Sequence, residues 1–164
     1  MFENYVSPWM DEELHIMRDA VKKFIAKEFT PRTAIWEKQG FVDRNAWLKA
    51  GEAGLLCASI PSDYGGGGGN FRHEMVLVEE LAYANISGFG NGVHSGIVAH
   101  YINNYGSEAQ KLKWLPKMAT GEIVSAIAMT EPGAGSDLQA ISTTGILQGD
   151  HYLINGQKTF LTNG

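Results

Sequence analysis

The spacing of apolar residues changes near Gly121, and this change limits the possible folds more than any other feature of the chain. Before Gly121, apolar residues recur at every third or fourth position, which is typical of amphipathic helices. After it, they fall in short runs separated by turn residues, which is typical of β-strands. The sequence therefore predicts an α+β fold. An all-α helical-bundle domain in residues 1–121 precedes the start of an antiparallel β-domain in 122–164, which we expect to be incomplete.

Cap and breaker residues locate the first two expected helices. Ser7 can cap free amides and Pro8 suits the first helical turn, so we expect the first helix to begin there. Pro31 should end this helix, because proline disfavours helical geometry in the preceding residue. A second helix fits residues 43–53, with Gly54 as its stop.

Three more helices are expected after a run of five glycines at 65–69, which we interpret as a flexible loop. Asn70 can cap the third helix, and the apolar segment 93–102 forms a fourth that should be buried on most sides. Ser107 and Gln110 make a capping box for the fifth. The expected apolar stripe of the third helix is Phe71, Met75, Val78, Leu81 and Ala82.

Short strand-like segments follow Gly121. They are residues 123–129, 142–147, 152–154 and 158–161, and the pairs Gly149-Asp150 and Asn155-Gly156 suit tight hairpin turns. Three or four such strands make a partial sheet with open edges. We therefore expect the chain to be a fragment of a longer protein or a truncated gene model.

Composition excludes several classes of function. Apolar residues make up 44% and charged residues 19% of the chain, as in ordinary globular proteins. The net charge is −5 and no basic stripe exists, so nucleic acid is excluded as a partner. The single cysteine, Cys57, cannot form a disulfide within the chain, so nothing indicates an oxidising compartment. Its apolar neighbours predict that it is a small buried side chain. The start lacks a signal-peptide pattern and no run could span a bilayer, so we expect a soluble cytoplasmic protein.

The segment 128–140 carries the most chemical information. An expected strand ends at the hydroxyl of Thr130, Pro132 fixes a turn, and Gly133 and Gly135 let the backbone approach a ligand closely. Ser136 and neighbouring amides can donate to an anionic or polar group. The residues alone leave two interpretations open: a loop that holds a phosphate or the polar edge of a ring, and a plain strand–turn connection.

The same segment, Ala128–Ala140, resembles the signature of the acyl-CoA dehydrogenase family along its whole length. The second recognisable stretch of that family is present as Asn155–Gly164, at a matching separation. Upstream, His94–Val98 and Tyr105–Glu108 are most similar to the long-chain branch. The resemblance covers nearly all 164 residues.

The resemblance implies that the strand and loop from Ile127 to Ser136 line FAD. The hydroxyl of Thr130 would bond the isoalloxazine ring, and backbone groups of Met129 and Thr130 would face its pyrimidine edge. Gly135 and Ser136 would lie against the pyrophosphate side and the entering acyl-CoA. Ser136 is therefore also the expected substrate-binding residue.

In the second stretch, the resemblance implies that Thr162 contacts the flavin near its redox-active nitrogen, with Leu161 in the same cofactor-binding set. Phe160 stands where many members of the family carry tryptophan. An aromatic face is retained at this position, but the indole N–H donor is lost.

The resemblance also implies an activity: FAD-dependent α,β-dehydrogenation of fatty acyl-CoA to trans-2-enoyl-CoA in fatty-acid β-oxidation. Electrons would pass to an electron-transferring flavoprotein, and the full-length enzyme would be a homotetramer or a dimer. The catalytic glutamate of the family belongs to a carboxy-terminal helical domain. No catalytic residue is therefore expected in this chain, and Glu131 is expected to be structural.

Other interpretations remain open. The chain could belong to a branched-chain acyl-CoA dehydrogenase or an acyl-CoA oxidase, or act as a non-catalytic helical fragment with a binding or structural role. No metal site is expected, because the spacing of His94 and His100 does not place both on one helix face; hydrogen-bonded packing roles suit them better. Small residues such as Gly92 and Gly96 would leave room for a long acyl tail.

Overall fold

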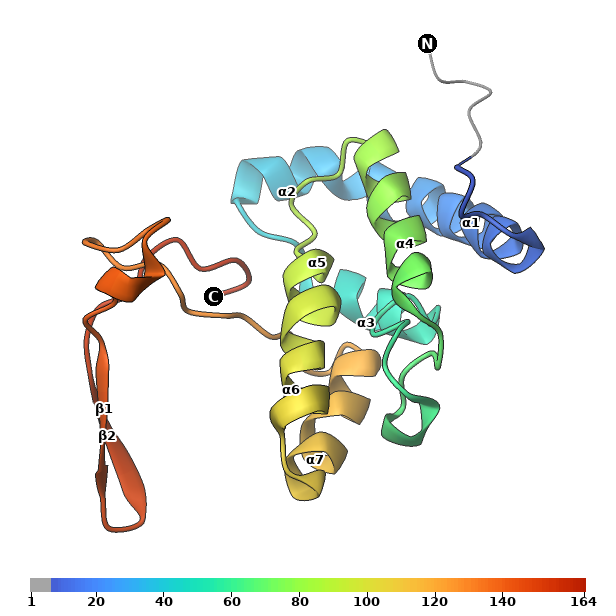
Figure 1. The fold of residues 1–164 in the computed structure, drawn as a ribbon. Helices are drawn as coiled ribbons and strands as arrows, with labels where there is room; N and C mark the ends of the chain where they lie inside the picture. Colours follow the sequence, from blue (N-terminus) through green and yellow to red (C-terminus); the bar gives the residue numbers. More distant parts are fainter. Residues whose placement is uncertain (1–6) are drawn as a thin grey trace. The chain divides into compact units, whose positions relative to one another are not determined.

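The computed structural model describes residues 7–164, and the chain divides into two units at Val124/Ser125 (Figure 1). The segment whose sequence lacks a signal-peptide pattern, residues 1–5, lies outside the described part. Unit 1 is helical and unit 2 carries an antiparallel hairpin, so the predicted α+β class is confirmed. Neither unit has a described helix long and apolar enough to cross a membrane.

Unit 1 contains the five predicted helical regions, two of which are divided into shorter segments, and a further helix at Thr33–Gln39 that was not predicted. The α-helices are α1 (Glu12–Phe24), α2 (Thr33–Gln39), α3 (Arg44–Glu52), α4 (Phe71–Tyr83), α5 (Asn91–Val93), α6 (Ala99–Tyr105) and α7 (Glu108–Ala119). Two π-helical turns, Ile25–Phe29 and His94–Val98, follow α1 and α5, and the short 3₁₀-helices are Thr30–Arg32 and Ser62–Tyr64. Both predicted polar caps after the glycine run form, at Asn70 and Ser107.

The predicted ends of the first helix are both wrong. The helix begins at Glu12 because Asp11 caps it, its carboxylate accepting from the amide of Leu14 at 3.0 Å. Pro31 does not end the helical run; it lies in the first turn of a 3₁₀-helix, where its missing N–H is not needed. The chain continues from there into α2.

The exposed and buried faces of α4 also differ from the prediction. Val76, Leu77 and Leu81 are buried together with two glutamates, whereas Phe71 is 61% and Val78 39% exposed. The predicted stripe counted apolar residues alone. The helix is instead oriented by its buried carboxylates, which find partners inside the unit.

The segment 93–102 is buried on one face only within the described residues. His94, Ser95 and Ala99 are buried, whereas Ile97 and Tyr101 are exposed. The prediction of burial on most sides is therefore wrong for this unit. The imidazole of His94 donates to the backbone oxygen of Met118 (3.1 Å).

The glycine run is held in place by hydrogen bonds, contrary to the expectation of a flexible loop. The amides of Gly67, Gly68 and Gly69 donate to carbonyls of the segment 57–60 at 2.9–3.1 Å. Close backbone approach explains the glycines, because an added Cβ at Gly67 would lie 2.7 Å from the oxygen of Ala58. Cys57, in this segment, is buried as predicted, and burial raises the pKa of its thiol to about 12.

Aromatic rings form the centre of the larger core. The Phe29 ring packs edge-on against Trp36 and Phe89, with centroids 5.3 and 4.8 Å away, and Trp47 lies 4.3 Å from Phe89. Such pairs add to the free energy gained from apolar burial. They connect the π-helical turn after α1 to α2, α3 and the loop after α4.

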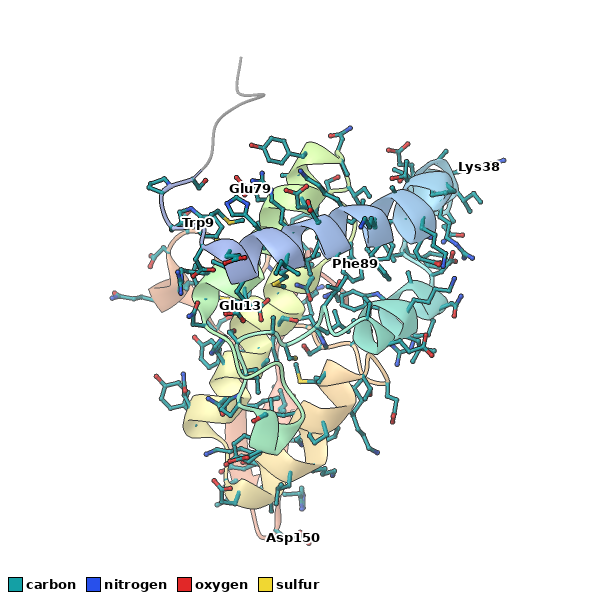
Figure 2. The ribbon with its side chains drawn as sticks, turned by 90° about the vertical axis from the view of Figure 1, so that its right-hand side faces the viewer. Trp9, Glu13, Lys38, Glu79, Phe89 and Asp150 are labelled. Carbon is teal, nitrogen blue, oxygen red and sulfur yellow. The ribbon has the colours of Figure 1, made fainter. Side chains whose placement is uncertain are left out.

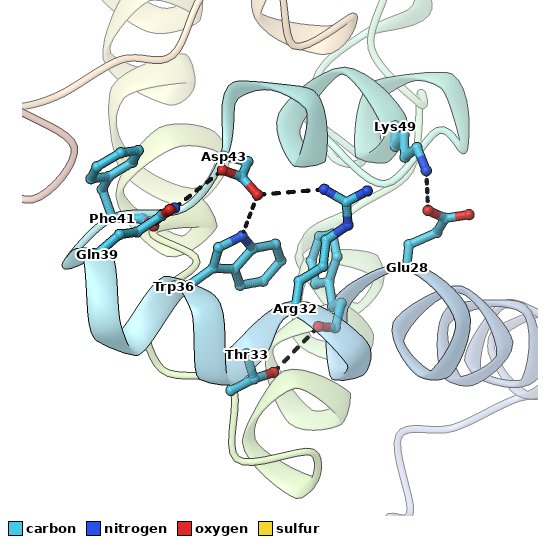
Figure 3. A network of polar contacts seen from close by, with 9 residues as sticks. Glu28, Arg32, Thr33, Trp36, Gln39, Phe41, Asp43 and Lys49 are labelled. Carbon is cyan, nitrogen blue, oxygen red and sulfur yellow. Dashed lines mark hydrogen bonds and ion pairs between the residues drawn. The ribbon is translucent and has the colours of Figure 1, made fainter.

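A polar network fixes the junction between α2 and α3 (Figure 3). The carboxylate of Asp43 accepts from the Trp36 indole at 2.9 Å and the Gln39 amide at 3.1 Å, and Arg32 lies 3.4 Å away. These bonds from Trp36 and Gln39 lower the pKa of Asp43. The turn between them uses Gly40, whose φ of +81° suits glycine.

A buried ion pair joins α1 to α4, which pack together (Figure 2). The guanidinium of Arg18 donates to Glu80 at 2.6 Å and lies 3.7 Å from Glu79. The side chain of Arg18 is 13% exposed and that of Glu80 only 4%. Removal of the cation would leave a buried carboxylate without its partner.

We expect Arg18→Ala to lower the free energy of unfolding by about 3–5 kcal/mol, because breaking a buried pair leaves an uncompensated charge. Urea denaturation followed by circular dichroism measures the change. Lys22→Ala removes an exposed cation from the same helix and serves as the control. Equal effects of the two substitutions would contradict a structural role for the buried pair.

Unit 2 contains one hairpin, formed by β1 (Thr144–Gln148) and β2 (His151–Asn155). Gln148 pairs with His151, so Gly149 and Asp150 make the predicted tight turn. The predicted strands at 123–129 and 158–161 are wrong, because neither segment forms a strand among the described residues. Asn155-Gly156 is not a hairpin turn; Gly156 packs closely against Thr143.

Candidate functional site

The signature segment of unit 2 is built around a tight turn. The amide of Glu131 donates to the oxygen of Ala134 at 2.8 Å, and the amide of Ala134 donates back at 3.1 Å. Pro132 and Gly133 occupy the tip, and an added Cβ at Gly133 or Gly135 would meet no atom within 4 Å. The backbone at the tip is therefore uncovered in unit 2, and the approach of a ligand to these glycines stays a prediction.

Direct contacts bring the two family-like stretches together. The amide of Thr159 donates to the oxygen of Thr130 at 3.0 Å, and the ammonium of Lys158 donates to the oxygen of Met129 at 3.1 Å. Asn163 adds a bond from its side-chain amide to the oxygen of Ser125 at 3.2 Å. These bonds join the two segments, although neither forms the predicted strand among the described residues.

Glu131 occupies the centre of this arrangement and is only 5% exposed. One carboxylate oxygen accepts from the amide and hydroxyl of Ser142, both at 2.8 Å. The other accepts from the amide of Thr143 at 3.0 Å and lies 2.8 Å from the ammonium of Lys158. The ammonium of Lys158, helped by these donors, holds the pKa of Glu131 well below its usual range. The expected structural role of Glu131 is confirmed.

The eight expected cofactor-binding residues differ in exposure. Ile127, Thr130 and Leu161 are half-buried, whereas Met129, Gly135, Ser136, Phe160 and Thr162 are exposed. The hydrogen bonds above bring the segments carrying them together in unit 2. Lys158 was not among the predicted site residues, because nothing in the sequence around it distinguishes it from a surface lysine.

Phe160 has the most unusual conformation of this set. Its φ is +55° and its side chain is 91% exposed. A bulky residue in the left-handed region is an outlier, and such strain is concentrated at ligand sites. The free aromatic face supports a role in contacting a flat apolar group.

Several other polar side chains among the described residues have local bonding partners. Asp137 accepts from the amide of Gln139 at 3.1 Å and starts the 3₁₀-helix Leu138–Ala140. Within residues 7–164, no group of three His, Cys, Asp or Glu side chains is placed to hold a metal ion. His100 lies 2.9 Å from the hydroxyl of Ser59 and His94 bonds Met118, so both histidines have the packing roles predicted for them.

Comparison with known families decides what this arrangement belongs to. Residues 11–122 match the model of the acyl-CoA dehydrogenase amino-terminal domain, and residues 126–164 match that of the middle domain. The chain belongs to the acyl-CoA dehydrogenase family. The two domains are represented to different extents, since only the first part of the β-domain lies within the chain.

Individual acyl-CoA dehydrogenases give the same picture. The chain is 47% identical over 152 residues to the mitochondrial long-chain specific acyl-CoA dehydrogenase of Sus scrofa, covering 93% of this chain and 35% of that one. The structure of the Geobacillus kaustophilus acyl-CoA dehydrogenase matches with a TM-score of 0.93 and 50% identity, over 97% of this chain and 42% of that one. The Bacillus anthracis acyl-CoA dehydrogenase complexed with FAD matches with a TM-score of 0.88 and 34% identity, over 97% and 28%. The chain thus spans about a third of the length of its curated relative.

The lowered pKa of Glu131 makes stability depend on pH. The folded pKa lies below the unfolded value of about 4.3, so the stabilisation is complete above that value and is lost as the pH falls below it. We expect the free energy of unfolding to fall more steeply from about pH 5 to pH 3 than in Glu131→Gln. Urea denaturation across this range measures the slopes. Glu37→Gln, at an exposed carboxylate of α2, should keep the wild-type slope.

Proposed function

We propose that this chain forms the amino-terminal part of an FAD-dependent enzyme that dehydrogenates fatty acyl-CoA to trans-2-enoyl-CoA. The observation that carries this proposal is the joining of the two family motifs through Thr130–Thr159 and Lys158–Met129. The chain covers about a third of its relatives' length, so the activity is proposed for the full-length enzyme.

Several groups of unit 2 fit a flavin. Phe160 presents an aromatic face, and hydroxyls of Thr130 and Thr162 stand on the two joined stretches. The oxygen of Met129 is engaged by Lys158 and that of Thr130 by Thr159, so the carbonyls near the pyrimidine edge are held in fixed directions. These residues, with Ile127 and Leu161, would hold the ring.

FAD, when bound, supplies the acceptor for the hydride that leaves the β-carbon of the substrate. The contribution of this chain is binding and orientation. Ser136 is exposed just after the turn that ends at Ala134, so its hydroxyl can donate to the entering acyl-CoA. Glu131 cannot serve as the base that takes the α-proton, because both of its oxygens accept bonds within the loop. By the family resemblance, the base would be a glutamate in the carboxy-terminal helical domain of the full-length enzyme.

We extend the proposal to partners and location on the basis of the family resemblance. An electron-transferring flavoprotein would receive the electrons, and the full-length enzyme would be a homotetramer or a dimer. A cytoplasmic location would distinguish it from its mitochondrial relative of Sus scrofa. Size-exclusion chromatography of the full-length enzyme and cell fractionation test these points.

The test uses a full-length enzyme that carries residues 1–164; a chimera with the remaining part of the Geobacillus kaustophilus enzyme provides one. We expect a flavin absorption band that is bleached by palmitoyl-CoA under anaerobic conditions, with release of trans-2-hexadecenoyl-CoA. Re-oxidation by flavoprotein rather than by oxygen would separate the dehydrogenase from an oxidase. A protein that folds but takes up no FAD would contradict the proposal.

A long acyl chain is the proposed substrate because small residues border an apolar hollow in unit 1. Gly92 lines this hollow of about 400 Å³ beside Val78, Leu81 and Ile86, and an added Cβ at Gly92 would meet no atom within 4 Å. The family resemblance assigns part of the acyl pocket to residues 85–105. The space left by glycine would accept the end of a long tail.

We expect Gly92→Leu in the full-length enzyme to lower kcat/KM for palmitoyl-CoA relative to butyryl-CoA by about tenfold or more, because leucine fills the hollow. Steady-state kinetics with both substrates measures the ratio. Asn104→Leu adds the same side chain at an exposed position of α6 and should leave the ratio unchanged. A wild-type preference for butyryl-CoA would refute the long-chain assignment.

A further inference from the structure

We propose that Lys158 is a positioning residue of the flavin site: its contacts set the spacing between the two joined stretches of unit 2. This inference rests on the proposed function. Its ammonium contacts both the carboxylate of Glu131, at 2.8 Å, and the backbone oxygen of Met129, at 3.1 Å. One side chain of the second stretch therefore contacts two residues of the first, on either side of Thr130.

The placement of these contacts separates Lys158 from an ordinary surface lysine. Its side chain is 21% exposed, and that of its partner Glu131 is 3% exposed. Met129 and Thr130 directly precede Glu131, while Phe160 and Thr162 closely follow Lys158. The ion pair is thus bracketed on both sides by residues expected to contact the ring.

The carboxylate of Glu131, which Lys158 binds, is held by residues next to the hairpin. Ser142 and Thr143, just before β1, direct three donors at the Glu131 carboxylate, at distances of 2.8–3.0 Å. These three bonds hold the carboxylate in position independently of Lys158. Because Lys158 binds this carboxylate, the second stretch is held at a defined distance from Ser142 and Thr143, which precede the hairpin.

The conformation of Phe160 needs such support. A bulky residue persists at a φ of +55° only when its surroundings hold the backbone there. The two bonds immediately before it, Lys158 to Met129 and Thr159 to Thr130, supply that restraint. Loss of the first bond would let Phe160 relax, and misplacement of a reacting group by about 1 Å can cost on the order of 100-fold in rate.

The charge of Lys158 is paired within the protein, which distinguishes this residue from an anion-binding lysine. The ammonium is already neutralised by Glu131, whose pKa it lowers, so its charge is committed to the protein. Lysine has three donors, and two of them are used here. Lys158 is therefore assigned a role through the protein backbone and not as a direct ligand of a phosphate.

The experiment compares Lys158→Met, Lys158→Arg and Glu131→Gln in the FAD-loaded full-length enzyme. The readouts are the dissociation constant of FAD, measured by flavin fluorescence, the visible spectrum of the bound flavin, and kcat and KM separately.

We expect Lys158→Met to weaken FAD binding about tenfold and to lower kcat at saturating FAD by on the order of 100-fold, with little change in KM. Lys158→Arg should recover most of both, since it keeps the cation. Lys38→Met removes an exposed lysine of α2 and is the control (Figure 2).

The outcomes separate this inference from the proposed function. A wild-type enzyme that neither binds FAD nor oxidises acyl-CoA overturns both. If the wild type does both, but Lys158→Met lowers only the melting temperature and keeps wild-type FAD affinity, flavin spectrum and kcat, the residue is merely structural and the positioning role is wrong. Loss of FAD affinity in Lys158→Met without recovery in Lys158→Arg also overturns it.

Discussion

Each unit buries a carboxylate whose partners come from distant parts of the chain, and the cost of burying an unpaired charge fixes how those parts meet. In unit 1, Glu80 of α4 bonds Arg18 of α1. In unit 2, Glu131 gathers donors from Ser142, Thr143 and Lys158. An apolar core tolerates sliding of its elements, whereas a charge with directed bonds has one satisfactory arrangement. The two pairs therefore specify register where apolar burial alone would not.

The consequence in unit 2 concerns function. The backbone of residues 127–136 is not organised by a sheet, since the predicted strand is absent, and the turn at Glu131 has only the short bridge to Ala134. Its carbonyls are oriented by side chains and amides of the second stretch. The carbonyl oxygens of Met129 and Thr130 are thereby held in fixed directions. The same bonds hold Phe160 in an unfavourable conformation with its ring free.

Unit 1 combines a well-packed aromatic core with exposed apolar side chains. Its aromatic core and the network at Asp43 hold α2 and α3 together, while α4 and the segment after it keep apolar side chains exposed, such as Phe71 and Ile97. The curated long-chain relative is nearly three times as long as the matched stretch. Membership of the acyl-CoA dehydrogenase family rests on both units, because each matches its own domain model.

Sequence alone determined the features that depend on local chemistry. Caps at Asn70 and Ser107 need only a side chain near its own helix start, and the Gly149-Asp150 turn needs only two residues. The long motifs identified the family because their order of residues is rare. Tertiary structure decided the rest: which face of α4 is buried, that Pro31 lies within a helical run, and that Lys158 reaches Glu131 from 27 positions away along the numbering. Periodicity counts apolar residues and cannot include the partners that buried charges find, because those partners are set by the folded chain.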